Sequence, residues 1–292
     1  RGVGHAVQSG ITGRLPSVRR SGIVFLNDRS GMDRSGMDWS ESDRGCAMVL
    51  HVTESADRVT AVLDRPDKRN AIDLETIDAL HGVCAMLEAE PRTLILSGAG
   101  GVFAAGADIA ELRDRTAADA RRSINAAAFI RLHDLPMPVI AAIDGFALGG
   151  GAELAYAADV RIAGPGLRIG NPETGLGIIA AAGATWRLPE IVGEARAAEL
   201  LLTGRILDAD EALRWGLVSA VHPADELLAA AHAIADRIAR ADPLATQHTK
   251  RALRAARSEH PAIEQELQAE LFESPEKHRR MTAFLARKGH AT

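Results

Sequence analysis

Hydrophobic and polar residues alternate in an orderly way only from Val49 onward. The run Arg58–Leu63 alternates the two kinds of position and predicts a β-strand. Asp73 suits a helix N-cap, because its carboxylate can accept a hydrogen bond from a free amide of the first turn. After it, apolar residues recur at helical spacing, namely Leu74, Ile77, Leu80, Cys84 and Leu87. The ordered part of the chain therefore begins with a strand and an amphipathic helix.

Strand and helix patterns continue to alternate through the middle of the chain. Short apolar runs predict strands at Thr93–Leu96, Pro138–Ile143 and Val160–Ile162, and Ala117–Leu132 predicts a helix between the first two. This alternation indicates an α/β fold. Beyond about residue 194 the strand signals thin out, and helices are predicted at Glu194–Leu202, Ala209–Trp215, Ala224–Arg240 and Pro243–Arg257.

The last predicted helix begins with Ser274 as N-cap and Pro275 at its first position. It carries Met281, Phe284 and Leu285 on one face. Such an apolar stripe needs a cover, which is either the helix's own domain or a second subunit. The sequence leaves both alternatives open.

Residues 1–46 have a different character, because glycine, serine and arginine dominate and the pentapeptide Arg29–Asp33 is repeated at once as Arg34–Asp38. This is low-complexity sequence. A mitochondrial transit peptide is one interpretation, since several arginines precede the first acidic residue, Asp28. We favour the other interpretation, a disordered tail without chemistry of its own.

The amino-acid composition argues against several classes of protein. The 292 residues carry 34 Lys plus Arg against 39 Asp plus Glu, a net charge of −5, and 47% of them are hydrophobic. These values are typical of a globular protein and argue against a nucleic-acid-binding surface. No apolar run reaches the roughly 18 residues that a membrane span needs. Two cysteines, Cys46 and Cys84, cannot build a disulfide framework, so the cytoplasm is the expected location.

Several common site types are not indicated. The ten histidines show no metal-binding spacing, so no metal is expected, and His133 fits the end of a helix better than a catalytic role. The glycine-rich segments match neither a phosphate loop nor a dinucleotide-binding fingerprint, and no serine-hydrolase elbow is present. We therefore expect no separate cofactor.

Two glycine-rich turns each follow an apolar strand, one at Phe103–Ile109 and one at Leu148–Glu153. Small residues at such turns let backbone N–H groups approach a ligand, and two N–H donors together can hold an oxyanion. Taken alone, the Gly149–Gly151 run is weak evidence, because close helix packing or a flexible turn explains most such runs.

Two carboxylates lie close to these turns in the sequence. Glu153 interrupts an apolar segment, and burial there would raise its pKa into the range useful for proton transfer. Glu173 lies in the turn Gly170–Gly175. Each has a simpler reading, Glu153 as a first-turn helix residue and Glu173 as a solvated turn residue. Together with two oxyanion donors they would suit chemistry next to a carbonyl.

Several segments, in their order and spacing, resemble the enoyl-CoA hydratase/isomerase (crotonase) family from about Val49 to the C-terminus. They are Arg65–Ala71, Phe103–Ile109 with Glu111, Asp144–Glu153, Pro172–Glu173, Gly175–Gly177, Gly183–Thr185 with Arg187–Leu188, Ala212–Val221 and Met281–Leu285. The resemblance implies a crotonase-type spiral of repeated strand–strand–helix units, with a C-terminal helical region used to assemble homotrimers or homohexamers. We accordingly divide the chain into a tail at 1–46, a spiral core at 47–235 and a helical assembly region at 236–292.

The resemblance also implies an activity, in which water adds reversibly across the 2,3 double bond of a 2-enoyl-CoA thioester to give 3-hydroxyacyl-CoA. This is a step of fatty-acid or related acyl-CoA degradation. The family's oxyanion-hole amides fall on Ala107 and Gly150, and the two glutamates of its hydratases fall on Glu153 and Glu173. One glutamate accepts a proton from the water and the other donates one to C2. Glu173 is the preferred donor, but the sequence leaves the two roles open. The remaining substrate contacts are expected at Ala105, Asp108, Ile109 and Gly149.

The chain also departs from the family pattern. Ala110 stands where many members have a lysine that reaches the CoA phosphates, and Arg65, Lys68 or Arg113 could replace it. Two alternatives stay open beside hydration, namely an enoyl-CoA isomerase, which needs only one carboxylate, and a non-catalytic acyl-CoA-binding protein. RNA binding is disfavoured, because the chain has only four lysines.

Overall fold

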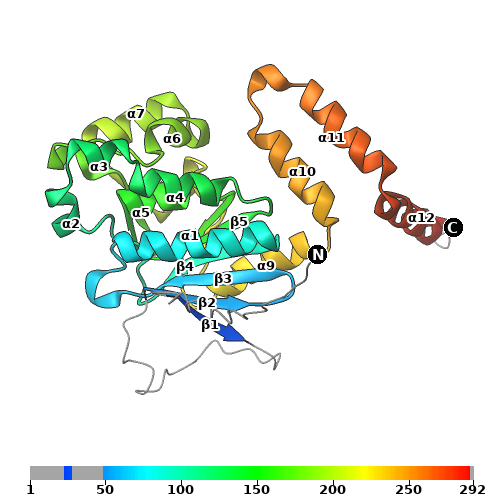
Figure 1. Cartoon of the computed structure of the whole chain (residues 1–292), viewed down its shortest axis with the longest axis horizontal. Helices are drawn as coiled ribbons and strands as arrows, with labels where there is room; N and C mark the ends of the chain where they lie inside the picture. The colour runs from blue at the N-terminus through cyan, green and yellow to red at the C-terminus, as the bar shows by residue number, and fades with distance from the viewer. Residues whose placement is uncertain (1–22, 28–48, 290–292) are drawn as a thin grey trace, which may run out of the picture.

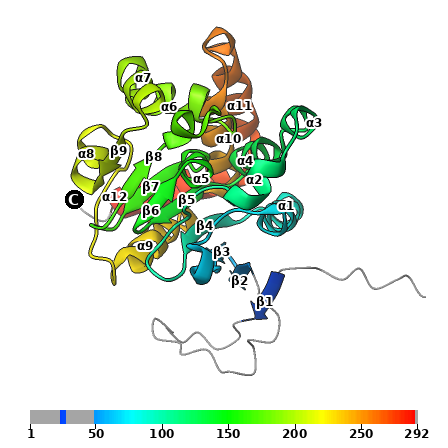
Figure 2. The same ribbon diagram turned by 90° about the vertical axis from the view of Figure 1, so that its left-hand side faces the viewer.

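The computed structural model describes residues 23–27 and 49–289, with side chains described over 49–287. Its larger sheet has six strands in the order β1-β2-β3-β4-β5-β7 (Figures 1 and 2). β2 and β3 pair antiparallel, and the other neighbours pair parallel. The strands are β1 (Ile23–Asn27), β2 (Leu50–Glu54), β3 (Arg58–Leu63), β4 (Thr93–Gly98), β5 (Val139–Ile143) and β7 (Val160–Ala163).

A smaller sheet of three short strands, β6 (Phe146–Leu148), β8 (Arg168–Gly170) and β9 (Ile206–Asp208), lies beside it. The chain steps from β5 in the larger sheet to β6 in the smaller one and then enters helix α5 (Gly150–Tyr156). It repeats the step from β7 to β8 and then runs through the 3-10 helix η3 (Pro172–Leu176) into α6 (Ala184–Val192). This repeat of strand, strand and helix is the spiral that the family resemblance implied.

Alternation along the strands of the larger sheet places apolar side chains on both of its faces. Leu94 and Leu96 of β4 belong to the main core, together with buried residues of α1 (Leu74–Ala89) and α4 (Ile124–His133). Ile95, between them, faces a second cluster formed with α9 (Leu227–Ala239). The sheet is thus covered by helices on both sides.

The remaining helices are short or lie toward the C-terminus. They are η2 (Pro66–Lys68), α2 (Ile109–Asp114), α3 (Ala117–Arg121), α7 (Glu194–Thr203), α8 (Ala209–Arg214), α10 (Pro243–Arg254), η4 (Arg257–Glu259), α11 (Ala262–Glu273) and α12 (Pro275–Gly289). In Figure 1, α11 and α12 stand apart from the two sheets. On α12, Met281, Phe284 and Leu285 are more than half exposed.

The predicted strands and most predicted helices are confirmed within a few residues, including α1 with its Asp73 N-cap and α12 with Pro275 at its start. The single helix predicted over Ala117–Leu132 is wrong. Ser123 adopts a left-handed conformation (φ 53°), which ends α3 and lets α4 begin in a new direction. Helices α2, α6 and α11 and the short strands β8 and β9 were not predicted.

Residues 1–46, predicted as a disordered tail, lie mostly outside the described residues. Ile23–Asn27 differ from that prediction, because they form strand β1 parallel to β2. Among the described helices, none is both long enough and apolar enough to cross a membrane.

Candidate active site

The first glycine-rich turn is fixed by pairing with the strand-like residue Ile72. The Ile72 N–H donates to the Gly106 carbonyl at 2.8 Å, and the Asp108 N–H donates to the Ile72 carbonyl at 2.9 Å. The N–H of Ala107, between these two bonds, has no backbone acceptor in the described part of the chain. It is one of the two predicted oxyanion donors.

The second donor begins a helix. Gly149 is the N-cap of α5 and Gly150 its first residue, so the Gly150 N–H is one of the first-turn amides that have no partner inside the helix. A Cβ built on Gly150 would lie 3.5 Å from the Ala107 nitrogen. The two predicted donors are therefore neighbours, and both line a cavity of about 640 Å³.

The other predicted substrate contacts divide into two groups. Ala105, Ile109 and Gly149 line the cavity. Asp108 instead uses its carboxylate to cap α2, accepting from the Ala110 N–H at 3.0 Å, and it lies 3.9 Å from the Arg65 guanidinium. Its side chain is engaged in holding the turn rather than in lining the cavity.

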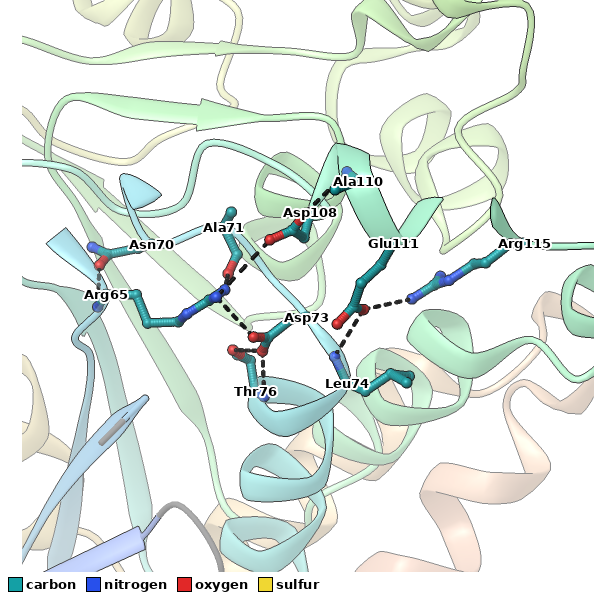
Figure 3. Close-up of polar contacts among 10 residues, drawn as sticks. All are labelled: Arg65, Asn70, Ala71, Asp73, Leu74, Thr76, Asp108, Ala110, Glu111 and Arg115. Atoms are coloured by element: carbon teal, nitrogen blue, oxygen red, sulfur yellow. Dashed lines mark hydrogen bonds and ion pairs between the residues drawn. The ribbon is translucent and has the colours of Figure 1, made fainter. Parts of the chain in front are cut away.

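Arg65 connects this turn to the start of α1 (Figure 3). It donates to the Ala71 carbonyl at 2.5 Å and pairs with Asp73 at 2.9 Å, and Asp73 in turn caps α1 through the Thr76 N–H. Because Arg65 is engaged in these contacts, it is not a free cation for a CoA phosphate. Of the proposed substitutes for the missing lysine, Lys68 and Arg113 are the exposed ones.

Glu153 lies on α5, one turn after Gly150, and is only 3% exposed. Its Oε1 accepts hydrogen bonds from the Ala182 N–H at 2.7 Å and the Ala184 N–H at 3.1 Å. Burial raises the pKa of Glu153 to about 7, and the neighbouring Glu173 carboxylate adds to the rise while the two amides oppose it. The carboxyl group therefore exchanges protons near neutral pH.

Glu173 comes from η3 and is 9% exposed, so it is not the solvated turn residue of the simpler reading. Its Oε1 accepts from the Asn171 amide at 3.3 Å, while its Oε2 has no hydrogen-bond partner among the described residues. Burial raises the pKa of this carboxyl group too. Asn171 is held in place by the Tyr156 hydroxyl, which donates to its Oδ1 at 3.0 Å.

Arg187 contacts the loop whose Ala182 and Ala184 N–H groups bind Glu153. Its N–H donates to the Gly183 carbonyl at 2.9 Å, and a Cβ on Gly183 would come within 2.3 Å of its Nη1, so a side chain at 183 would displace the guanidinium. The guanidinium is buried against the Trp186 ring, 4.0 Å from its centroid. None of its three nitrogens has a hydrogen-bond partner within the described residues.

The cavity wall contains polar residues that the sequence analysis missed, among them Arg115 and Asn125. No spacing or motif marks them. His133 ends α4, as expected, and its Nδ1 lies 3.2 Å from the Ala157 carbonyl. Within the described residues, no group of three or more His, Cys, Asp or Glu side chains is placed to hold a metal ion.

Two amides without a backbone acceptor in the described part of the chain and two buried carboxylates therefore meet at one cavity. The amides can stabilise negative charge on a carbonyl oxygen, and the carboxylates can give and take protons beside it.

Known proteins resemble this chain over most of its length. A sequence model of the enoyl-CoA hydratase/isomerase family matches residues 56–290. A probable enoyl-CoA hydratase of Mycobacterium tuberculosis is 38% identical over 232 residues, covering 77% of this chain and 90% of that protein. The short-chain-enoyl-CoA hydratase of Clostridium acetobutylicum is 37% identical over 247 residues, covering 81% and 95%.

A solved structure extends the likeness to the fold. The enoyl-CoA hydratase of Bacillus anthracis superposes with a TM-score of 0.78 at 34% identity, covering 82% of this chain and 97% of that one. By sequence and by fold, the chain belongs to the enoyl-CoA hydratase/isomerase family.

Proposed function

We propose that this chain is an enoyl-CoA hydratase, a hydro-lyase that adds water across the 2,3 double bond of a 2-enoyl-CoA thioester. The observation that carries the proposal is the pair of buried carboxylates, Glu153 and Glu173, beside the Ala107 and Gly150 amides. Neither amide has a backbone acceptor among the residues that the structure describes. The hydratase names of its relatives support the same reaction. Coenzyme A is part of the substrate, and we propose no further cofactor.

In this mechanism the thioester oxygen lies between the Ala107 and Gly150 N–H groups, which stabilise the enolate-like charge that develops when water adds to C3. Preorganised donors of this kind contribute about 3 kcal/mol each in other oxyanion holes. The donors cost no reorganisation at the moment of reaction, because Ile72 fixes the first turn and α5 fixes the second.

The two carboxylates share the proton work. As the oxygen–C3 bond forms, the ionised carboxylate takes a proton from the water, and the protonated one gives its proton to C2. We assign donation to C2 to Glu173, because its Oε2 carries no hydrogen bond among the described residues whereas two amides hold Oε1 of Glu153. Exchange with solvent water restores the starting protonation. Close acidic pairs commonly share one proton in this way.

The test is an absorbance assay of the purified protein with a short 2-enoyl-CoA, following loss of the conjugated thioester band. Glu153→Gln and Glu173→Gln should each lower kcat by about 10²-fold or more, the usual scale of acid–base contributions. Glu266→Gln, on an exposed site of α11, is the matched control. Near-normal turnover in both active-site variants would refute the assignment.

The isomerase alternative is tested in the same assay by offering a 3-enoyl-CoA. Formation of the conjugated thioester from it, without hydration of 2-enoyl-CoA, would favour an isomerase. Tight acyl-CoA binding with neither reaction would favour a binding protein.

Two finer features belong to the same proposal. A homotrimer or homohexamer is supported by the exposed apolar side chains of α12. A cytoplasmic location rests on the cysteine content alone.

A further inference from the structure

A third N–H donor lies next to the two backbone amides. The Nδ2 atom of Asn125 is 3.8 Å from the position that a Cβ on Gly150 would occupy, and the Ala107 nitrogen is 3.5 Å from the same point. Asn125 lines the cavity together with Ala107 and Gly150. Three nitrogen donors from three different segments therefore surround one small region of the cavity.

The orientation of the Asn125 amide follows from its neighbour. Arg115 donates from Nη1 to the Asn125 Oδ1 at 3.1 Å. A guanidinium has only donors, so it can face only the oxygen of the amide, and this directs the NH₂ group away from Arg115. The Asn125 Nδ2 makes no hydrogen bond within the described residues, which leaves its protons available to a ligand in the cavity.

Arg115 is itself held in place. Its Nη2 lies 3.9 Å from the Glu111 carboxylate, and Glu111 accepts a hydrogen bond from the Leu74 N–H at the start of α1 (Figure 3). Ser123, in a left-handed conformation, is the N-cap of α4. The turn at this residue sets the direction of α4 and so places Asn125, the second residue of the helix, at the cavity. The donor is thus fixed by the fold from two directions.

We propose that the Asn125 side chain is a third donor of the oxyanion hole, and that it hydrogen-bonds the thioester oxygen as negative charge develops there. The inference rests on the proposed hydratase function. Arg115 also lines the cavity, and we assign it a positioning role, in which it holds the oxygen of the Asn125 amide and so directs the NH₂ group toward the substrate. A donor aimed at the transition-state oxyanion lowers the barrier more than it strengthens substrate binding.

The first test is kinetic. Asn125→Ala should lower kcat by about tenfold or more while KM changes by less than about threefold. Asn125→Asp, which has nearly the same shape, should lose more, because a carboxylate repels the developing charge. Thermal unfolding of both variants shows whether the fold is kept. A KM increase with unchanged kcat would overturn the proposal, because it would indicate a contact with another part of the substrate.

The second test uses two ligands that differ at the carbonyl. Acetoacetyl-CoA can ionise to an enolate, whose ultraviolet band reports charge stabilisation, whereas the thioether S-butyl-CoA has no carbonyl oxygen. Asn125→Ala should weaken the enolate band and the affinity for acetoacetyl-CoA about tenfold and leave S-butyl-CoA affinity within twofold. Equal losses for both ligands, or none for either, would overturn the proposal.

A double-variant comparison tests the role of Arg115. Arg115→Met should lower kcat in the native background but have little further effect when Asn125 is already alanine, since the two act as one unit. Arg121→Met, on an exposed site of α3, is the control. Additive losses would overturn the positioning role. If the unmodified protein binds neither CoA ligand, the hydratase proposal itself fails, and this inference fails with it.

Discussion

The Glu173 carboxylate lies against Gly149, on the side where a side chain at residue 149 would point. A Cβ built on Gly149 would come within 3.0 Å of the Glu173 Oε1. Gly149 also has a backbone conformation (φ 51°, ψ −123°) that residues with a side chain rarely adopt. The glycine therefore has two roles. It allows the chain to turn into α5, and it leaves room for a proposed catalytic carboxylate.

From this relationship we predict that Gly149→Ala displaces Glu173 and strains the turn. Catalysis should fall by at least tenfold, and the free energy of unfolding should fall by about 1–3 kcal/mol. Gly175→Ala is the control, because a Cβ there would meet no atom within 4 Å. The measurements are kcat/KM and chemical denaturation. Equal behaviour of the two variants would contradict the prediction.

The buried Glu153 should make stability depend on pH. Its pKa is about 7 in the folded protein against 4.5 as the ordinary value, so the folded state binds a proton more tightly than the unfolded chain does. The resulting stabilisation is complete below about pH 4.5 and is lost as the pH rises through about 7. The free energy of unfolding falls by about 3 kcal/mol at most over this range.

Glu153→Gln removes this dependence, because a glutamine does not ionise but its side-chain oxygen can still accept from Ala182 and Ala184. The variant should therefore gain stability relative to the unmodified protein between pH 5 and pH 8. Denaturant titrations across that interval measure the difference, with Glu266→Gln in parallel. A constant difference across the interval would show that Glu153 does not titrate there.

The α/β class and the strong periodic elements could be predicted from the sequence, because their signals are local. α1 has a capping aspartate and apolar residues at helical spacing, and β5 is a continuous apolar run. The weaker elements gave no such signal. α6 follows a run of small residues and contains Pro189, and α11 buries only Leu267 among its residues.

Some residues of the candidate site were also marked by their local sequence, and others were not. Glu153 could be singled out because it interrupts an apolar segment, and Glu173 because it stands in a glycine-flanked turn. Asn125 could not, since its position beside Gly150 depends on the left-handed turn at Ser123, where a run of helix-forming residues predicts a continuous helix. A contact between α4 and α5 joins two segments that are apart in the sequence, so the local pattern of neither segment predicts it.

Arg187 should influence the protonation of Glu153 without touching it. The guanidinium of Arg187 favours the ionised form of Glu153, whereas burial and the Glu173 carboxylate favour the protonated form. Arg187→Met should therefore move the limb of the kcat/KM profile that reports Glu153 to higher pH. Arg187→Lys keeps the charge and should restore the profile.

The fold itself should tolerate Arg187→Met, because an apolar side chain replaces a buried guanidinium that has no hydrogen-bond partner among the described residues. The matched control is Arg196→Met, which also removes an arginine from a tryptophan face, 5.2 Å from the Trp215 centroid, but on the surface. A lower rate with an unshifted pH profile would mean that Arg187 only supports the packing of α6.

The exposed face of α12 should hold subunits together. Met281, Phe284 and Leu285 lie on one side of this helix and are 55%, 58% and 67% exposed. Large apolar side chains that gather on one exposed face commonly mark a contact between proteins. Phe284→Glu together with Leu285→Glu should shift the mass measured by light scattering from a trimer or hexamer to a monomer. Ala283→Glu, on the opposite side of the helix, should leave the mass unchanged. A monomeric unmodified protein, or a double variant that stays oligomeric, would show that this face is not the subunit contact.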